Sequence, residues 1–122
     1  GETLTQRESG MTLAVICDQL TRGLSLADPY QKIMIAYEPV WAIGTGKVAT
    51  PEEAEEAHAG LRAQLVKITK DSRAKEISIL YGGSVKPYNV TSLIKQPNID
   101  GFLVGGASLD PQIFAKLCQQ SV

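Results

Sequence analysis

Apolar residues recur at regular intervals in the first part of the chain. Between positions 10 and 24 they return every three or four residues, at Leu13, Ile16, Cys17, Leu20 and Leu24. That spacing puts them on one face of a helix, so the pattern predicts an amphipathic helix from Gly10 to Leu24.

Two later helices are marked by their first turns. Thr50-Pro51-Glu52-Glu53 combines an N-cap hydroxyl, a proline at the first helical position and a glutamate that completes a capping box. The apolar face of this second helix continues through Ala57, Leu61, Leu65 and Ile68. Asp110-Pro111 opens a last helix in the same way, and a short helix is expected from Asn89 to Lys95.

Three short runs are almost wholly apolar, as strands covered on both faces are. They are "IMIAY" (33–37), "ISILY" (77–81) and "GFLV" (101–104). Because these runs alternate with helices, the sequence predicts an α/β fold with a parallel sheet. The carboxyl ends of parallel strands lie on one side of the sheet, which is where α/β proteins bind ligands.

Composition restricts the class of protein. The chain has 122 residues, which is room for about one small domain spanning 1–122. Its net charge is −1 and no basic stripe is present, which argues against a nucleic-acid partner. We see no signal peptide and no apolar run near the roughly 20 residues of a membrane helix, so a cytoplasmic protein without a membrane partner is expected. Cys17 and Cys118 are expected to be buried, reduced thiols, with a disulfide as the alternative.

A glycine-rich stretch follows the first predicted strand, in "IAYEPVWAIGTGKVATPEE" (35–53). It is not a P-loop, because Trp41 and Val48 stand where that motif needs a glycine and a hydroxyl. A dinucleotide fingerprint is met only formally, since the glycines neither close the strand nor open the helix. A mobile lid fits better: Pro39 stiffens one end, and Gly44 and Gly46 leave backbone N–H groups open to an anion. The alternative is an ordinary surface loop with a buried tryptophan.

Glu38 ends the first strand beside Tyr37 and near Trp41. Desolvation there would make it a stronger proton acceptor, whereas the alternative is a salt-bridged structural acid. The next two strands end in Gly82-Gly83-Ser84 and Gly105-Gly106, which read either as tight turns or as a phosphate site. The residues by themselves therefore predict a small phosphorylated ligand facing one carboxylate base.

Three segments together resemble the triosephosphate isomerase family. They are "AYEPVWAIGTGK" (36–47), "ILYGGSV" (79–85) and "GFLVGGASL" (101–109), and the leading "GETL" is similar to the family's segment just after its fifth strand. The resemblance implies a partial (β/α)8 TIM barrel: this chain would be the C-terminal portion, with about three βα units and a leading helix. It also implies cofactor-free and metal-free interconversion of dihydroxyacetone phosphate and glyceraldehyde 3-phosphate, in glycolysis and gluconeogenesis.

The same resemblance assigns roles to individual residues. Glu38 would be the catalytic base, moving a proton between adjacent carbons through an enediolate. Residues 39–49 would form the closing lid, with hinges at 39–41 and 47–49. The substrate's phosphate would be held by backbone N–H groups of Gly44, Ser84, Gly105 and Gly106. Arg62 and Asp100 would form a buried ion pair behind these loops, where the alternative is two solvated surface charges.

The family's strands one to five have no counterpart in this sequence, and with them go its catalytic lysine and histidine. The one histidine, His58, lies within a helix, so we expect it to be a structural or surface residue. The resemblance implies a homodimer for the full-length parent. The isolated chain, whether a fragment or a truncated product, is expected to be inactive and poorly folded without the N-terminal half.

Two other functions remain open at this level. One is a non-catalytic phosphate-binding module that kept the anion-binding loops and lost the chemistry. The other is a different phosphate-binding barrel enzyme. The long motif around Glu38 disfavours the second, because glycine turns alone would require neither that glutamate nor Trp41.

Overall fold

A computed structural model describes residues 1–28, 32–69 and 72–122 of the chain. Three strands form one parallel sheet in the order β1 (Ile35–Tyr37), β2 (Ile79–Tyr81) and β3 (Gly101–Phe102). Ile35 lies opposite Ile79 and Leu80 opposite Gly101, so the three carboxyl ends are on the same side. The predicted α/β class and parallel sheet are confirmed.

Each strand is shorter than its apolar run. Pairing of β1 with β2 begins where the Ile35 amide donates to the Ser78 carbonyl, at 2.9 Å. Ile33 and Ile77 therefore lie just before the paired region, although both still pack with the core. The apolar runs indicate which residues are buried. The length of a strand depends instead on how many of its residues lie within hydrogen-bonding distance of a neighbouring strand.

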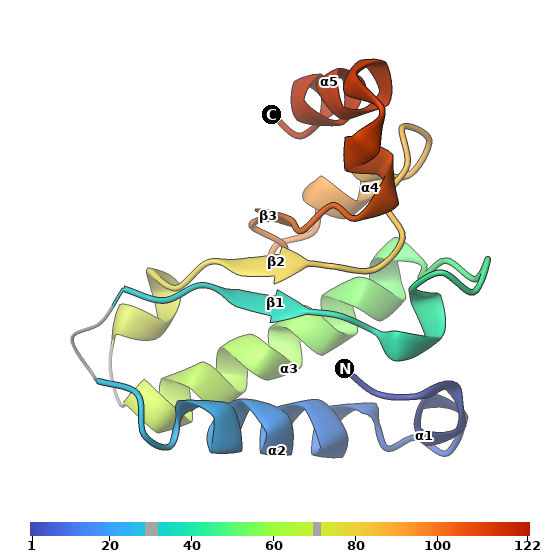
Figure 1. Ribbon diagram of the computed structural model, residues 1–122. Helices are drawn as coiled ribbons and strands as arrows, with labels where there is room; N and C mark the ends of the chain where they lie inside the picture. Colours follow the sequence, from blue (N-terminus) through green and yellow to red (C-terminus); the bar gives the residue numbers. More distant parts are fainter. Residues whose placement is uncertain (29–31, 70–71) are drawn as a thin grey trace.

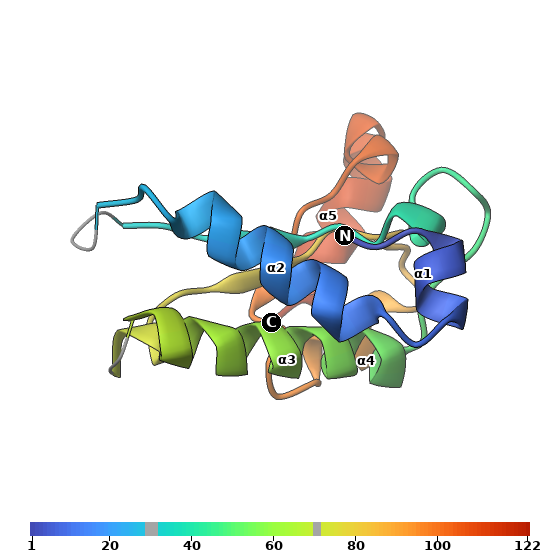
Figure 2. The same cartoon turned by 90° about the horizontal axis from the view of Figure 1, so that it is seen from below.

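The two long helices are α2 (Thr12–Leu24) and α3 (Pro51–Thr69), and they pack side by side beneath the sheet (Figures 1 and 2). The capping box predicted for α3 is present: the Glu53 amide donates to Thr50 Oγ1 at 3.1 Å, and the Thr50 amide donates to Glu53 Oε2 at 2.8 Å. The core lies mainly between these helices and the sheet, and it includes Ile16, Leu61, Leu65, Ile79 and Tyr81.

Shorter helices complete the fold. Helix α1 (Leu4–Glu8) precedes α2, α4 (Val90–Ile94) connects β2 to β3 and packs against α3, and α5 (Pro111–Gln120) follows β3 (Figure 1). Asp110 caps α5 as predicted, accepting hydrogen bonds from the Gln112 and Ile113 amides. The 3₁₀ turns η1 (Val40–Ala42), η2 (Ser72–Lys75) and η3 (Gly106–Leu109) were not predicted.

The remaining expectations concern the two cysteines, membrane helices and metal ligands. Cys17 and Cys118 are both free thiols, but Cys17 is only half-buried and Cys118 is exposed, so the expected burial is wrong. No helix within the described ranges is long and apolar enough to cross a membrane. Those same residues also contain no cluster of three or more potential metal ligands.

His58 is a structural residue, in line with the sequence interpretation. Its side chain is fully buried on α3, and Nδ1 lies 3.0 Å from the carbonyl oxygen of Asn98. Nδ1 therefore carries the proton of the neutral ring. Burial lowers the pKa of His58 from 6.5 to about 4, and the Asn98 carbonyl offsets only part of that effect.

We expect His58 to make the folded protein sensitive to mild acid. Its folded pKa is below its unfolded value, so its contribution is complete above pH 6.5 and is lost as the pH falls towards about 4. The difference corresponds to about 3 kcal/mol of unfolding free energy. Urea denaturation of the complete protein at pH 7 and pH 4 would measure it. The variant His58→Gln should lose distinctly less stability over that interval, and equal losses would contradict the assignment.

Candidate functional site

Glu38 directly follows β1 and lies against the end of β2. The Gly82 amide donates to the Tyr37 carbonyl at 2.8 Å, which holds the two strand ends together. A Cβ atom on Gly82 would lie 2.7 Å from Cγ of Glu38. Glycine at this position therefore leaves the space that the Glu38 side chain occupies.

The desolvation expected at Glu38 is not provided by its neighbours. Tyr37 and Pro39 on either side are buried, but Glu38 itself is exposed. The physical reason is its position: β1 is an outer strand of the sheet, and Gly1 and Glu2 contact the backbone at its carboxyl end while the Glu38 side chain stays open. The side chain is accessible to a ligand and to solvent alike.

The glycine-rich loop has a buried base and an exposed tip. Trp41 and Ala42, in η1, are buried, whereas residues 43–47 are exposed. Gly44 and Gly46 have φ angles of +66° and +82°, a left-handed backbone that suits glycine. Within the loop, Thr45 Oγ1 donates to the Trp41 carbonyl at 2.6 Å. This geometry fits a lid and equally fits the alternative of an ordinary surface loop with a buried tryptophan, so the lid stays a prediction.

All four residues predicted to hold a phosphate line one cavity. Gly44 from the loop, Ser84 after β2, and Gly105 and Gly106 after β3 surround a volume of about 240 Å³. Gly105 and Gly106 are exposed. The Ser84 amide donates to the Ala42 carbonyl at 3.0 Å, so this N–H group already has a partner.

Tyr81 lies beneath this cavity. Its ring is fully buried, and a Cβ atom on Gly83 would lie 2.2 Å from its hydroxyl oxygen. Burial raises the pKa of Tyr81 to about 12. Gly83 thus lets the loop after β2 pass directly over a neutral phenol.

Glu2 is a buried carboxylate that the sequence interpretation missed. It is fully buried and accepts hydrogen bonds from the Tyr37 hydroxyl at 2.9 and 3.0 Å and from Trp41 Nε1 at 2.9 Å. Burial, together with the Glu2 charge, raises the pKa of Tyr37. Glu2 thereby fixes the residue before Glu38 and the base of the loop. No periodicity marks it; the only signal in the sequence is its place in "GETL".

Arg7 supplies the positive charge beside Glu2. Its Nη1 lies 3.2 Å from Glu2 Oε1, and its guanidinium carbon lies 5.1 Å from the centre of the Trp41 ring. Burial by itself would lower the pKa of Arg7, but the hydrogen bond to Glu2 and the surrounding negative charges raise it overall. The group is a permanent cation in a mostly enclosed position.

The ion pair of Arg62 and Asp100 forms behind the loops, as the resemblance implied. Arg62 Nη2 donates to Asp100 Oδ2 at 2.5 Å, and Nη1 donates to the carbonyl oxygens of Ala74 and Ile77. Asp100 also accepts from the Ile79 amide at 2.7 Å. The side chains are 17% and 35% exposed, so the pair is half-buried, not fully enclosed.

Replacing Arg62 by methionine should lower the unfolding free energy by about 3 kcal/mol, because two carbonyl groups and a partly buried carboxylate lose their donor. Urea denaturation of the complete protein would measure this loss. The matched control is Arg22→Met, since Arg22 is 80% exposed and pairs only with Asp18 on its own helix, as far as the described residues go. An unchanged midpoint for Arg62→Met would show that the pair contributes nothing.

Comparison with known proteins connects these features to one family. The family model described as triosephosphate isomerase matches residues 1–121. A triosephosphate isomerase of Leptospira biflexa is 54% identical over 121 residues, covering 96% of this chain and 49% of its own length. A cytosolic triosephosphate isomerase of Gracilaria gracilis is 58% identical over 112 residues, covering 91% and 44%. One from Bdellovibrio bacteriovorus is 52% identical over 117 residues, covering 96% and 47%.

This chain spans about half the length of the curated relatives that it matches. The family model nevertheless extends over nearly every residue of it, including Glu38, the glycine-rich loop and the cavity. The chain belongs to the triosephosphate isomerase family.

Proposed function

We propose that residues 1–122 form the C-terminal portion of a triosephosphate isomerase, as a single unit of about three βα repeats from a (β/α)8 barrel. The support is the order of the three motifs at the ends of three successive parallel strands. The complete enzyme would interconvert dihydroxyacetone phosphate and glyceraldehyde 3-phosphate, a step of glycolysis and gluconeogenesis.

The observation that carries this proposal is the position of Glu38 next to the cavity. Gly82 lies against the Glu38 side chain and also lines the cavity together with Gly44, Ser84, Gly105 and Gly106. A triose bound with its phosphate in the cavity would therefore extend towards the carboxylate. Glu38 would take a proton from one carbon and return it to the next through an enediolate.

The phosphate would be held by backbone amides, in a cavity that the exposed Lys86 also lines. Gly44, Gly105 and Gly106 offer exposed backbone to an anion, and such N–H groups can approach a phosphate oxygen closely. The Ser84 amide would join them by exchanging the Ala42 carbonyl for a phosphate oxygen. This exchange would link phosphate binding to movement of the loop base that contains Ala42.

Residues 39–49 would then close as a lid over the bound substrate. Closure would exclude water from Glu38, which the described residues leave exposed, and would strengthen the electrostatic interactions beneath it. Exclusion of water would also protect an enediolate phosphate from losing its phosphate group. The desolvation that this chain alone lacks would thus come from the closed lid and from the rest of the barrel.

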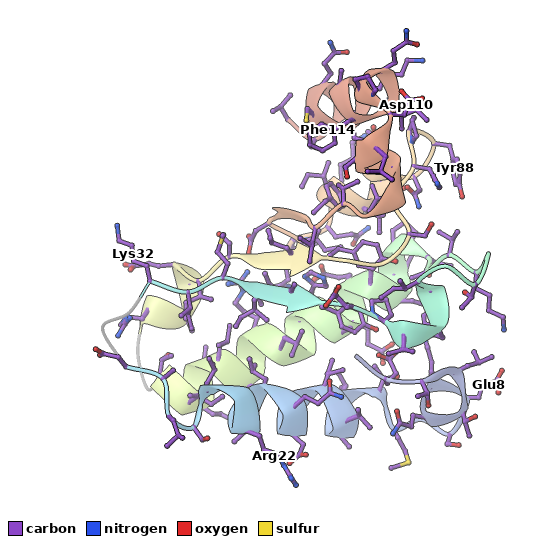
Figure 3. The ribbon with its side chains drawn as sticks, in the orientation of Figure 1. Glu8, Arg22, Lys32, Tyr88, Asp110 and Phe114 are labelled. Atoms are coloured by element: carbon purple, nitrogen blue, oxygen red, sulfur yellow. The ribbon has the colours of Figure 1, made fainter. Side chains whose placement is uncertain are left out.

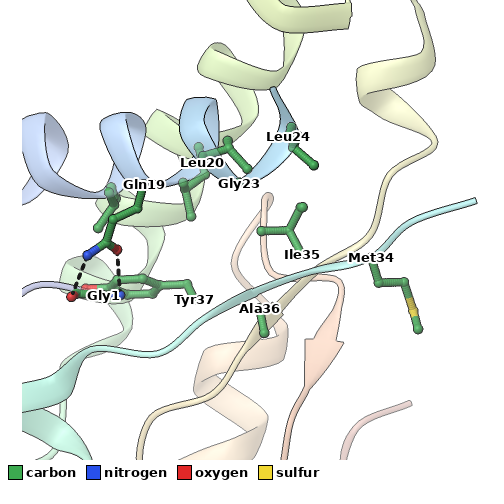
Figure 4. A pocket seen from close by; sticks show the side chains of 11 residues that line it. Gly1, Gln19, Leu20, Gly23, Leu24, Met34, Ile35, Ala36 and Tyr37 are labelled. Carbon is green, nitrogen blue, oxygen red and sulfur yellow. Dashed lines mark hydrogen bonds between the residues drawn. The ribbon is translucent and has the colours of Figure 1, made fainter. Parts of the chain in front are cut away.

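The reaction would also need the family's catalytic lysine and histidine, which we propose lie in the N-terminal half of the barrel. His58 is unsuited to that role, because it is buried on α3 and bonded to Asn98. The N-terminal half would pair with the outer edge of β1, where a cavity of about 290 Å³ separates α2 from the strand (Figure 4). We also propose, from family membership alone, a cytoplasmic homodimer that needs no cofactor.

The exposure of Glu38 favours one alternative, a phosphate-binding module without catalysis. Solvent exchange at carbon distinguishes the two. Dihydroxyacetone phosphate incubated with the complete protein in D2O should acquire carbon-bound deuterium and yield glyceraldehyde 3-phosphate, both visible by NMR. Binding of substrate with neither exchange nor isomerisation would support the module and refute the proposed enzyme.

A further inference from the structure

Arg7, on the short helix α1, contacts both ends of the glycine-rich loop. Its guanidinium carbon lies over the ring of Trp41, 5.1 Å from the ring centre, and Trp41 belongs to the 3₁₀ turn at the start of the loop. Its Nε lies 3.7 Å from Oε1 of Glu53, and its Nη2 lies 3.7 Å from Oε2 of Glu56. Both glutamates are in the first turns of α3, directly after the loop ends.

The position of Arg7 is tightly determined. Its side chain is 14% exposed, and Nη1 serves the fully buried carboxylate of Glu2. A buried carboxylate without its cation is strongly unfavourable, so Arg7 cannot leave while Glu2 stays enclosed. Glu53 is held in turn by the capping box with Thr50. The two ends of the loop therefore share one rigid intermediary.

The chemistry requires arginine at this position. A guanidinium is planar, so one face can stack on an indole while its edges donate to several carboxylates at once. Lysine keeps the charge but presents a single point donor and no flat face. Lysine could therefore neutralise Glu2, but only arginine can also contact both ends of the loop.

We propose that Arg7 is a positioning residue that holds the first hinge of the lid, at Trp41, in a fixed relation to the start of α3, which follows the second hinge. This inference rests on the proposed function, because it takes residues 39–49 as the lid. A lid closes when a few hinge residues change their backbone angles while the flanking structure stays still. Arg7 holds Glu2 beneath the first hinge and the start of α3 after the second, so that Trp41 moves against a fixed frame. Without it, the closed form is a smaller fraction of the molecules, and apparent affinity for a phosphorylated ligand falls in proportion.

The test uses the complete enzyme and glycerol 3-phosphate, which binds as a triose phosphate but cannot isomerise. Trp41 is the only tryptophan of the chain, so its fluorescence reports on the first hinge once any tryptophan outside these residues is replaced by phenylalanine. The variants are Arg7→Met and Arg7→Lys. The control is Arg22→Met on the outer face of α2, where the side chain points away from the body of the protein (Figure 3).

We expect Arg7→Met to weaken binding of glycerol 3-phosphate about tenfold, which is within the range of a desolvated cation–π contact. It should lower kcat/KM to a similar extent and reduce the change in Trp41 emission on binding. Arg7→Lys keeps the charge that Glu2 needs and should fold even where Arg7→Met does not. It should still lose several-fold in affinity, while Arg22→Met should match the wild type.

Two outcomes would overturn the assignment. If Arg7→Lys is less stable but binds glycerol 3-phosphate as the wild type does, with the same change in Trp41 emission, Arg7 has only a structural role. If the wild-type enzyme neither isomerises nor binds the ligand, the proposed function fails, and the role of Arg7 fails with it. The first outcome appears only in the variants and the second already in the wild type, so the two failures are distinguishable.

Discussion

Replacing Glu38 by glutamine should lower kcat of the complete enzyme by about 10³-fold, because general base catalysis contributes on that order. Glutamine has nearly the same shape and still fits the space that Gly82 leaves. It cannot accept the proton from carbon, so substrate would bind while the reaction stops. Since Glu38 is exposed, the substitution should barely change the unfolding free energy.

Two further variants separate chemistry from charge. Glu38→Asp keeps the carboxylate but moves it back by one methylene. A misplacement of about 1 Å should lower kcat about 10²-fold. Glu52→Gln removes an exposed acid on the first turn of α3 and should leave kcat and KM unchanged. Steady-state assays and solvent deuterium exchange would measure all three. Normal turnover by Glu38→Gln would eliminate Glu38 as the base.

Local chemistry explains what could be predicted from the sequence. Thr50 with Glu53, and Asp110 with its proline, are capping arrangements complete within four residues, and both helices begin where these signals indicate. The parallel sheet followed from alternating helices and apolar runs. Helix α1 was missed because it has only five residues and no apolar face, although Thr3 and Gln6 do form a capping box.

Contacts between distant segments explain what could not be predicted. Glu2 meets Tyr37 and Trp41 across more than thirty positions of sequence, and only the folded chain brings them together. The exposure of Glu38 depends on what lies beside β1, which the residues around Glu38 do not encode. The four phosphate-binding candidates were identified from glycine turns and the family resemblance. Their arrangement around one cavity required the sheet order and register.

The edges of the sheet bear on the proposed partial barrel. Among the described residues, β1 and β3 each pair only with β2, which leaves two open edges. Open edges with apolar neighbours promote association with other chains. Met34 beside β1 is 71% exposed and Leu103 after β3 is 46% exposed. A closed barrel would cover both edges and would enclose the inner face of the sheet.

The isolated 122-residue chain should therefore show no measurable isomerase activity and no cooperative urea transition. Its helices can still form, so circular dichroism should report α-helix while size-exclusion chromatography reports self-association. Adding a separately produced N-terminal half should restore turnover, because under the proposed function that half would supply strands for both edges together with the proposed lysine and histidine. The matched control is the same mixture with Glu38→Gln in this chain, which should assemble and stay inactive. Substantial turnover by the isolated chain would show that Glu38 and the amide-lined cavity suffice without the rest of the barrel.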